Sequence, residues 1–180
     1  FEVLEWRGAY RQADSLLDSV LTLDCGEMER SNMLHRKGWV SRCLGHFEAA
    51  LAHFNASMDI CRAIDFPLGR IRDLNGMAII HNMVGQTADA RACYDALLAE
   101  EKLVEYPMWE AITKSNLGNW YRRKGDLDQA LECLQQGHDM FVDLKQSRQI
   151  ASAIYNLGEL YLTLGSFDQS LEHYRRAQAM

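Results

Sequence analysis

Apolar residues recur along most of this chain with the period of an amphipathic helix. One clear segment has its apolar residues at the i, i+3, i+4 and i+7 spacing of a single buried face: Leu127, Ala130, Leu131 and Leu134. We find no segment with the period-two alternation that marks a half-buried strand, so the pattern predicts an all-α fold. The predicted helices span residues 9–23, 29–43, 47–64, 69–83, 87–104, 108–123, 127–144, 148–163 and 167–180, and residues 1–7 are predicted to end a further helix.

The helical pattern is itself repeated. Glycines recur every 40 residues, at positions 45, 85, 125 and 165, and a partial copy surrounds Gly8, which lies 37 residues before Gly45. A small residue lies seven positions before each of the four glycines, and Pro67 and Pro107 are also 40 residues apart. We predict that each glycine ends the first helix of a pair with a positive φ angle, that the small residues allow close helix approach, and that the prolines lie at repeat junctions.

This register predicts one domain, a single array over residues 1–180. It consists of a partial repeat over residues 1–28 and of repeats over about 29–68, 69–108, 109–148 and 149–180. The chain opens with Phe1 and stops within a helical pattern, so we expect it to be a piece of a longer protein.

Composition narrows the class of partner. Hydrophobic residues make up 48% of the chain and charged residues 24%, the proportions of a folded protein. The net charge of −6 disfavours direct binding to nucleic acid or to an anionic membrane, and no stretch approaches the ~18 apolar residues of a membrane span. The five cysteines form no C-x-x-C pair, which favours free thiols in a reducing compartment and hence a cytoplasmic location.

Motifs of catalysis and metal binding were sought and not found in the sequence. It contains no H-E-x-x-H or Cys/His zinc spacing, no glycine-rich phosphate loop and no G-x-S-x-G nucleophile elbow. We therefore predict that the protein is not an enzyme and has no catalytic residues, no metal site and no cofactor.

The repeat resembles the tetratricopeptide repeat (TPR) family. The fourth copy carries the resemblance best, with the residues Asn156-Leu157-Gly158, Tyr161, Gly165, Tyr174 and Ala177. The usual repeat has about 34 residues, so a period of 40 implies the variety with longer helices, similar to repeats of cell-polarity adaptors and of bacterial signalling and transcription-regulating proteins. The resemblance implies a right-handed superhelical solenoid of antiparallel helix pairs that binds partners on its concave face.

The resemblance also implies which positions line that face, namely those 13, 10, 6, 3 and 2 residues before each turn glycine. The candidate peptide-binding residues are Asn32, His35, Trp39, Arg42, Arg72, Asn75, Ile79, Asn82, Ser115, Asn119, Arg122, Arg123, Ser152, Tyr155 and Glu159. Four arginines against one acid favour a peptide with some acidic character, and asparagine amides suit a peptide backbone. The alternative is that these are ordinary solvated residues of a helix face.

The predicted function is a protein–protein interaction scaffold that binds a peptide or protein segment in the concave groove. An alternative is a regulatory or sensor TPR domain of a larger signalling or transcription-regulating protein. A further expectation is self-association through the ends of the array, because an uncapped solenoid exposes apolar surface there.

Overall fold

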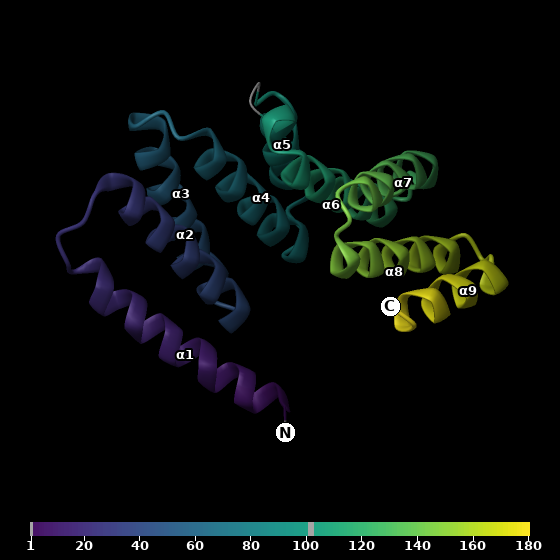
Figure 1. Cartoon of the computed structure of the whole chain (residues 1–180), viewed down its shortest axis with the longest axis horizontal. Coiled ribbons are helices and arrows are strands. Elements are labelled where there is room, and N and C mark those ends of the chain that lie inside the picture. Colours follow the sequence, from purple (N-terminus) through teal and green to yellow (C-terminus); the bar gives the residue numbers. More distant parts are fainter. Residues whose placement is uncertain (1, 101–102) are drawn as a thin grey trace. The chain divides into compact units, whose positions relative to one another are not determined.

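The computed structural model describes residues 2–100 and 103–180, and every regular element in them is a helix. The elements are α1 (Glu2–Leu21), α2 (Glu27–Leu44), α3 (Phe47–Ala63), α4 (Pro67–Met83), α5 (Thr87–Leu98), the short 3₁₀ helix η1 (Leu103–Glu105), α6 (Pro107–Lys124), α7 (Leu127–Asp143), α8 (Ser147–Thr163) and α9 (Phe167–Gln178) (Figure 1). The all-α prediction is confirmed. The chain divides into two compact units, residues 1–102 and residues 103–180, which are described separately below.

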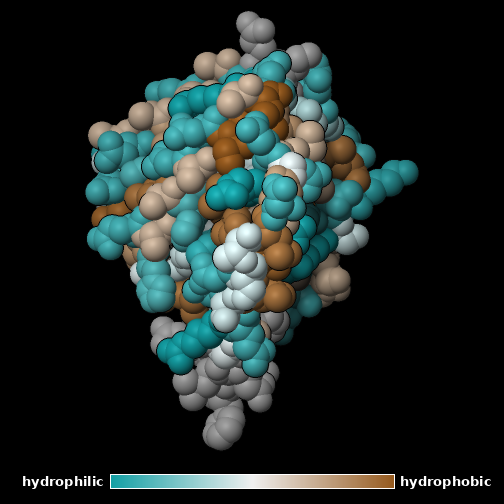
Figure 2. All heavy atoms as spheres, turned by 90° about the vertical axis from the view of Figure 1, so that its left-hand side faces the viewer, coloured by the Kyte–Doolittle hydropathy of each residue, from teal (hydrophilic) through white to brown (hydrophobic). Residues whose placement is uncertain are grey.

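In unit 1 (residues 1–102), each of the helices α1 to α5 packs against the next, and α2 also contacts α4. The buried core between α3 and α4 consists of Ala50, Phe54, Met58, Met77 and Ile80. On the side of the molecule shown in Figure 2, hydrophobic residues emerge in small groups between hydrophilic ones. The core of unit 1 is therefore the seam between consecutive helices, as expected of stacked helix pairs.

In unit 2 (residues 103–180), α6 packs on α7, α7 on α8 and α8 on α9, and α6 also contacts α8. One buried cluster joins α7 to α8 through Ala130, Leu134, Leu157 and Leu160. A second joins α6, α7 and α8 through Ala111, Phe141 and Ala153. The apolar spacing noted at Leu134 thus faces a neighbouring helix.

The turn glycines adopt the predicted left-handed conformation. The φ angles of Gly45, Gly85, Gly125 and Gly165 are 84°, 80°, 83° and 74°. After Gly45, the backbone N–H of His46 donates to the carbonyl of Ser41 at 2.9 Å, and the same six-residue closure follows the other three glycines. These bonds satisfy carbonyls that a helix end would leave unpaired, which explains the recurrence of glycine at this position.

Small residues allow the helices of a pair to approach closely, as predicted. A β-carbon built on Gly118 would lie 2.7 Å from Cγ of Leu134, and one built on Gly38 would lie 2.8 Å from the ring of Phe54. The prolines also have their predicted place at repeat junctions, because Pro67 and Pro107 are the first residues of α4 and α6. Proline suits that position because its missing N–H would be unpaired there in any case.

Two predicted boundaries are wrong. Residues 1–7 do not end a separate helix: α1 runs without interruption through Gly8 to Leu21, because a lone glycine costs a helix only about 1 kcal/mol and does not end it. The helix predicted over 87–104 ends at Leu98, and the 3₁₀ turn at Leu103–Glu105 precedes Pro107. Proline restricts the backbone before it, which favours a break in the helix near this point. Residues 101 and 102 of that predicted span lie outside the described residues, as does Phe1.

Candidate functional site

The candidate peptide-binding residues lie on the first helix of each pair and form one set in each unit. The α2–α4 face of unit 1 carries Asn32, His35, Trp39, Arg42, Arg72, Asn75, Ile79 and Asn82. The α6–α8 face of unit 2 carries Ser115, Asn119, Arg122, Arg123, Ser152, Tyr155 and Glu159. Within each unit the two helices contact one another, so each face is a continuous surface of two neighbouring helices.

Polar side chains of the α2–α4 face are bound to one another. Nη2 of Arg72 donates to Oδ1 of Asn32 at 2.5 Å, and Nδ1 of His35 lies 2.7 Å from Oδ1 of Asp73. Asp73 is fully buried, and burial lowers the pKa of the Arg72 guanidinium while the Asp73 carboxylate opposes that shift. We call His35, Asp73, Asn32 and Arg72 the α2–α4 polar network. Because these groups bond in pairs between α2 and α4, they contribute to packing the two helices against each other. Nε of Arg72 is buried without a hydrogen-bond partner.

Trp39 is the most exposed aromatic side chain of the predicted set in unit 1. It is 43% exposed, and the edge of its ring system meets Tyr10 of α1 at a centroid distance of 5.4 Å. The guanidinium carbon of Arg42 lies 5.9 Å from the Trp39 ring, within range of a cation–π contact. A rigid aromatic held in place on two sides and open on a third is well suited to anchor a partner.

An apolar depression beside Trp39 was not predicted from the sequence. It has a volume of about 370 Å³ between α1 and α2 and is lined by Ala13, Leu16, Leu17, His35, Arg36, Trp39 and Val40. Leu16 is 65% exposed at its rim. The sequence predicts the helix that carries Ala13, Leu16 and Leu17, but not how its side chains pack against the next helix.

On the α6–α8 face, the positive charge of Arg122 is balanced by the carboxylate of Glu159. Nη2 of Arg122 lies 3.8 Å from Oε2 of Glu159, and Nη1 donates to Oγ1 of Thr163 at 3.4 Å. Glu159 also accepts a hydrogen bond from the hydroxyl of Tyr174, whose pKa is raised by desolvation and by that carboxylate. Arg122 therefore offers less to an acidic ligand than its sequence position suggests.

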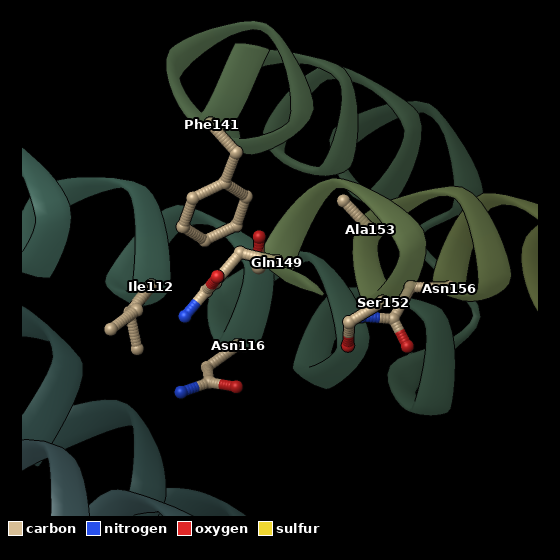
Figure 3. Close-up of a pocket in the computed structure, with 8 residues that line it drawn as sticks. Ile112, Asn116, Phe141, Gln149, Ser152, Ala153 and Asn156 are labelled. Atoms are coloured by element: carbon tan, nitrogen blue, oxygen red, sulfur yellow. The ribbon is translucent and has the colours of Figure 1, made fainter. Parts of the chain in front are cut away.

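A polar pocket lies between α6, α7 and α8 (Figure 3). Its volume is about 150 Å³ and its walls are Ile112, Ser115, Asn116, Phe141, Gln149, Ser152, Ala153 and Asn156. Ser115 is 6% exposed, and its buried hydroxyl has no hydrogen-bond partner. The sequence reasoning included Ser115 and Ser152 but missed Asn116, Gln149 and Asn156.

The other predicted residues differ in accessibility. Asn75 is buried, whereas Ile79, Asn82 and Asn119 are half-buried. Arg123, Ser152 and Tyr155 are exposed on the α6–α8 face. Exposure at these three positions leaves them available for contact with a partner.

The described residues offer neither a candidate metal site nor a candidate membrane-spanning helix. Among these residues, no group of three or more His, Cys, Asp or Glu side chains is placed to hold a metal ion. No helix in the same residues combines the length and the apolar character that crossing a membrane requires.

Comparison with known proteins identifies the repeat. Residues 109–180 match the family model of the tetratricopeptide repeat. A search of curated proteins finds no match.

Among solved structures, the chain is similar to BtubC (BKLC) from P. vanneervenii, with 18% identity, a TM-score of 0.77 and coverage of 97% of this chain and 74% of that one. It is also similar to a Rap protein complexed with competence and sporulation factor, with 18% identity and a TM-score of 0.83 over 98% of this chain and 48% of that one. A putative kinesin light chain of Podosopora anserina with TPR-like repeats has 17% identity and a TM-score of 0.67, over 98% of this chain and 90% of that one. The chain thus spans about half of the Rap protein, and at these identities the likeness concerns the fold.

Proposed function

We propose that this chain, whose residues 109–180 match the tetratricopeptide repeat, is an interaction scaffold that binds a peptide or protein segment on the α2–α4 face of unit 1 or on the α6–α8 face of unit 2. The observation that carries the proposal is the pair of exposed aromatic residues on these faces: Trp39 is 43% exposed and Tyr155 is 50% exposed. Large aromatic side chains that remain accessible on a rigid helix supply much of the energy of many protein interfaces. The similar Rap structure, solved with competence and sporulation factor, supports a binding role for this fold.

The partner we propose is an extended or helical segment with some acidic character. Of the four arginines among the predicted residues, Arg72 and Arg122 are engaged within the protein. An acidic preference therefore rests on Arg42, in the last turn of α2. A guanidinium at the edge of an aromatic anchor can pair with a carboxylate without being buried.

The test is a binding screen of the intact chain against a peptide library, followed by variants of the best binder's site. We expect Trp39→Ala or Tyr155→Ala to weaken binding at least tenfold, whereas Phe167→Ala, a control 67% exposed on α9, should not. If the control and the two face variants bind alike, the proposed faces are wrong.

Charge is tested separately with an acidic peptide from the same screen. Arg42→Glu should weaken its binding and make the loss of affinity in added salt shallower, because it removes an attractive charge that salt would otherwise screen. Arg62→Glu on α3 is the matched control, since its side chain is 66% exposed on a second helix. Equal losses in both variants would indicate a nonspecific charge effect and refute the acidic preference of the face.

A regulatory or sensor role is the second candidate, favoured by the likeness to the Rap protein in its factor complex. A sensor must change its conformational equilibrium on binding, not only hold its ligand. Small-angle scattering of the chain with and without a bound library peptide distinguishes the two roles, since a scaffold keeps its dimensions and a sensor does not.

Self-association through the last helix pair is a further proposal. Tyr155, Tyr174 and Ala177 line an open depression between α8 and α9, and Leu171 nearby is 47% exposed. In the rest of unit 2, the equivalent face of α7 is covered by α8. Light scattering over a concentration series should show a rising mass that Leu171→Glu abolishes, and a constant mass would refute the proposal.

A cytoplasmic location is proposed from the cysteines. All five are free thiols, and Cys61 and Cys133 are buried. Free buried thiols are typical of proteins in reducing compartments. Fractionation of cells that express the full protein would test the location.

A further inference from the structure

We propose that the pocket between α6, α7 and α8 binds one uncharged amide side chain, a glutamine or an asparagine, of the partner peptide. The inference rests on the proposed function and names the chemistry that one part of the α6–α8 face selects. Its lining includes Ser152, which is exposed, and the buried residues Phe141 and Ser115. Figure 3 shows the amide of Gln149 and that of Asn116 near one another on one side, with Asn156 beside Ser152 on the other.

The lining excludes ions by its composition. Its eight residues carry hydroxyls, amides and apolar groups but no charged side chain. A carboxylate or an ammonium entering this space would lose hydration without gaining a counter-charge, which is unfavourable. Arg122 and Glu159, two charged residues of this face, are paired with each other.

A purely apolar ligand group is also disfavoured. The Ser115 hydroxyl is buried without a hydrogen-bond partner. An aliphatic ligand group could not pair with it and would leave it unsatisfied, which is unfavourable. An amide carries a donor and an acceptor at one end, so it can bond to the serine hydroxyl and to the wall amides together. Its methylene groups would lie against Ile112 and Phe141.

The size of the pocket agrees with this assignment. Its volume of about 150 Å³ equals that of a cavity known to admit a benzene molecule. A glutamine side chain is of comparable size, whereas an indole would not fit without movement of the helices.

At three positions that correspond between the two units, unit 2 has smaller side chains than unit 1. Counting back two repeats of 40 residues, Arg72 occupies the place of Ser152, Asp73 that of Ala153 and His35 that of Ser115. In unit 1 these larger side chains belong to the α2–α4 polar network and hydrogen-bond to other side chains of α2 and α4. In unit 2, two serines and an alanine stand in their places, and the space is left for a side chain from outside.

The first experiment uses small probes rather than an unidentified partner. The intact chain is titrated with N-acetylated, C-amidated glutamine, glutamate, lysine and leucine, and backbone amide shifts are followed by NMR. We expect the glutamine probe to shift Ser115, Ser152 and Ala153 with a dissociation constant at least tenfold below that of the other three. Equal or tighter binding of glutamate or leucine, or shifts confined to other helices, would overturn the proposal.

The second experiment alters the pocket. Ser152→Leu fills the opening from an exposed position that need not disturb folding, and Ser147→Leu, also exposed on α8, is the matched control. Ser152→Leu should abolish the glutamine shifts and Ser147→Leu should keep them. Ser115→Ala should reduce the preference for glutamine over leucine, because it removes the buried hydroxyl; an unchanged preference contradicts the role given to Ser115.

The outcome also separates this inference from the proposed function. Suppose that library peptides bind and that Trp39→Ala weakens their binding. If Ser152→Leu then changes neither their affinity nor the shifts caused by the glutamine probe, the pocket assignment alone fails. If the glutamine probe binds as expected and no library peptide binds to either face, the scaffold function fails.

Discussion

Replacing Gly118 with alanine should destabilise the protein, although alanine is the better helix former. The new methyl carbon would lie 2.7 Å from Cγ of Leu134 and 3.0 Å from the Leu134 backbone nitrogen, where carbon contacts prefer about 3.5–4.0 Å. Leu134 is fully buried and the nitrogen belongs to helix α7, so neither can turn aside. Overpacking of this kind costs about 1–3 kcal/mol, and the helix preference returns about 0.5–1 kcal/mol. We expect a net loss of about 1–2 kcal/mol.

Urea denaturation followed by circular dichroism at the helical band measures this loss. Gly8→Ala is the control, because a β-carbon on Gly8 of α1 meets nothing within 4 Å. That variant should gain up to about 1 kcal/mol, since only the helix preference acts on it. A Gly118→Ala protein as stable as the parent would refute the idea that these glycines are required for close packing. The double variant with Leu134→Ala should lose less than the sum of the two single losses, because the smaller side chain makes room.

Other positions test other parts of the structure. Gly125→Ala should lower the free energy of unfolding by about 1–2 kcal/mol through its φ of 83° alone, since its β-carbon would contact nothing; thermal melts measure this, and an unchanged midpoint would contradict it. Asp73→Ala should cost about 3–5 kcal/mol in urea, because it leaves the α2–α4 polar network without its buried carboxylate; a loss below ~1 kcal/mol would show that His35 finds another partner. Burial lowers the pKa of His53, so stability should be complete above the unfolded value near 6.5 and fall as the pH drops below it. His53→Gln should reduce that slope, and an identical pH profile would refute the assignment.

Most of the fold could be predicted from the repeat period. Equal spacing of Gly45, Gly85, Gly125 and Gly165 implies equal local geometry, and the structure gives all four the same turn. The prediction failed where the interval was 37 residues instead of 40: the glycine there, Gly8, lies inside a helix. A glycine permits a turn but does not compel one, so its role depends on the residues that follow.

The candidate faces were less completely predictable. The period places Asn32 beside Arg72, one repeat apart, but whether two polar groups bond to each other or face a ligand depends on burial and rotamers. Arg72 and Arg122, which the period predicts to face a ligand, also contact groups of the protein itself. The pocket could have been suspected from the serine and alanine that replace Arg72 and Asp73 at positions 152 and 153.

The α2–α4 polar network and the pocket of unit 2 occupy corresponding positions of the repeat, so side chains at these positions can change without a change of fold. The same backbone register holds hydrogen-bonded side chains in unit 1 and a pocket in unit 2, where Ser115, Ser152 and Ala153 replace His35, Arg72 and Asp73. Building the same pocket in unit 1 would also require its wall amides, because Arg36, Gly69 and Gly76 stand in the places of Asn116, Gln149 and Asn156. In such a protein, the preference for a ligand side chain therefore depends on residues at fixed positions of the repeat, while the backbone stays the same.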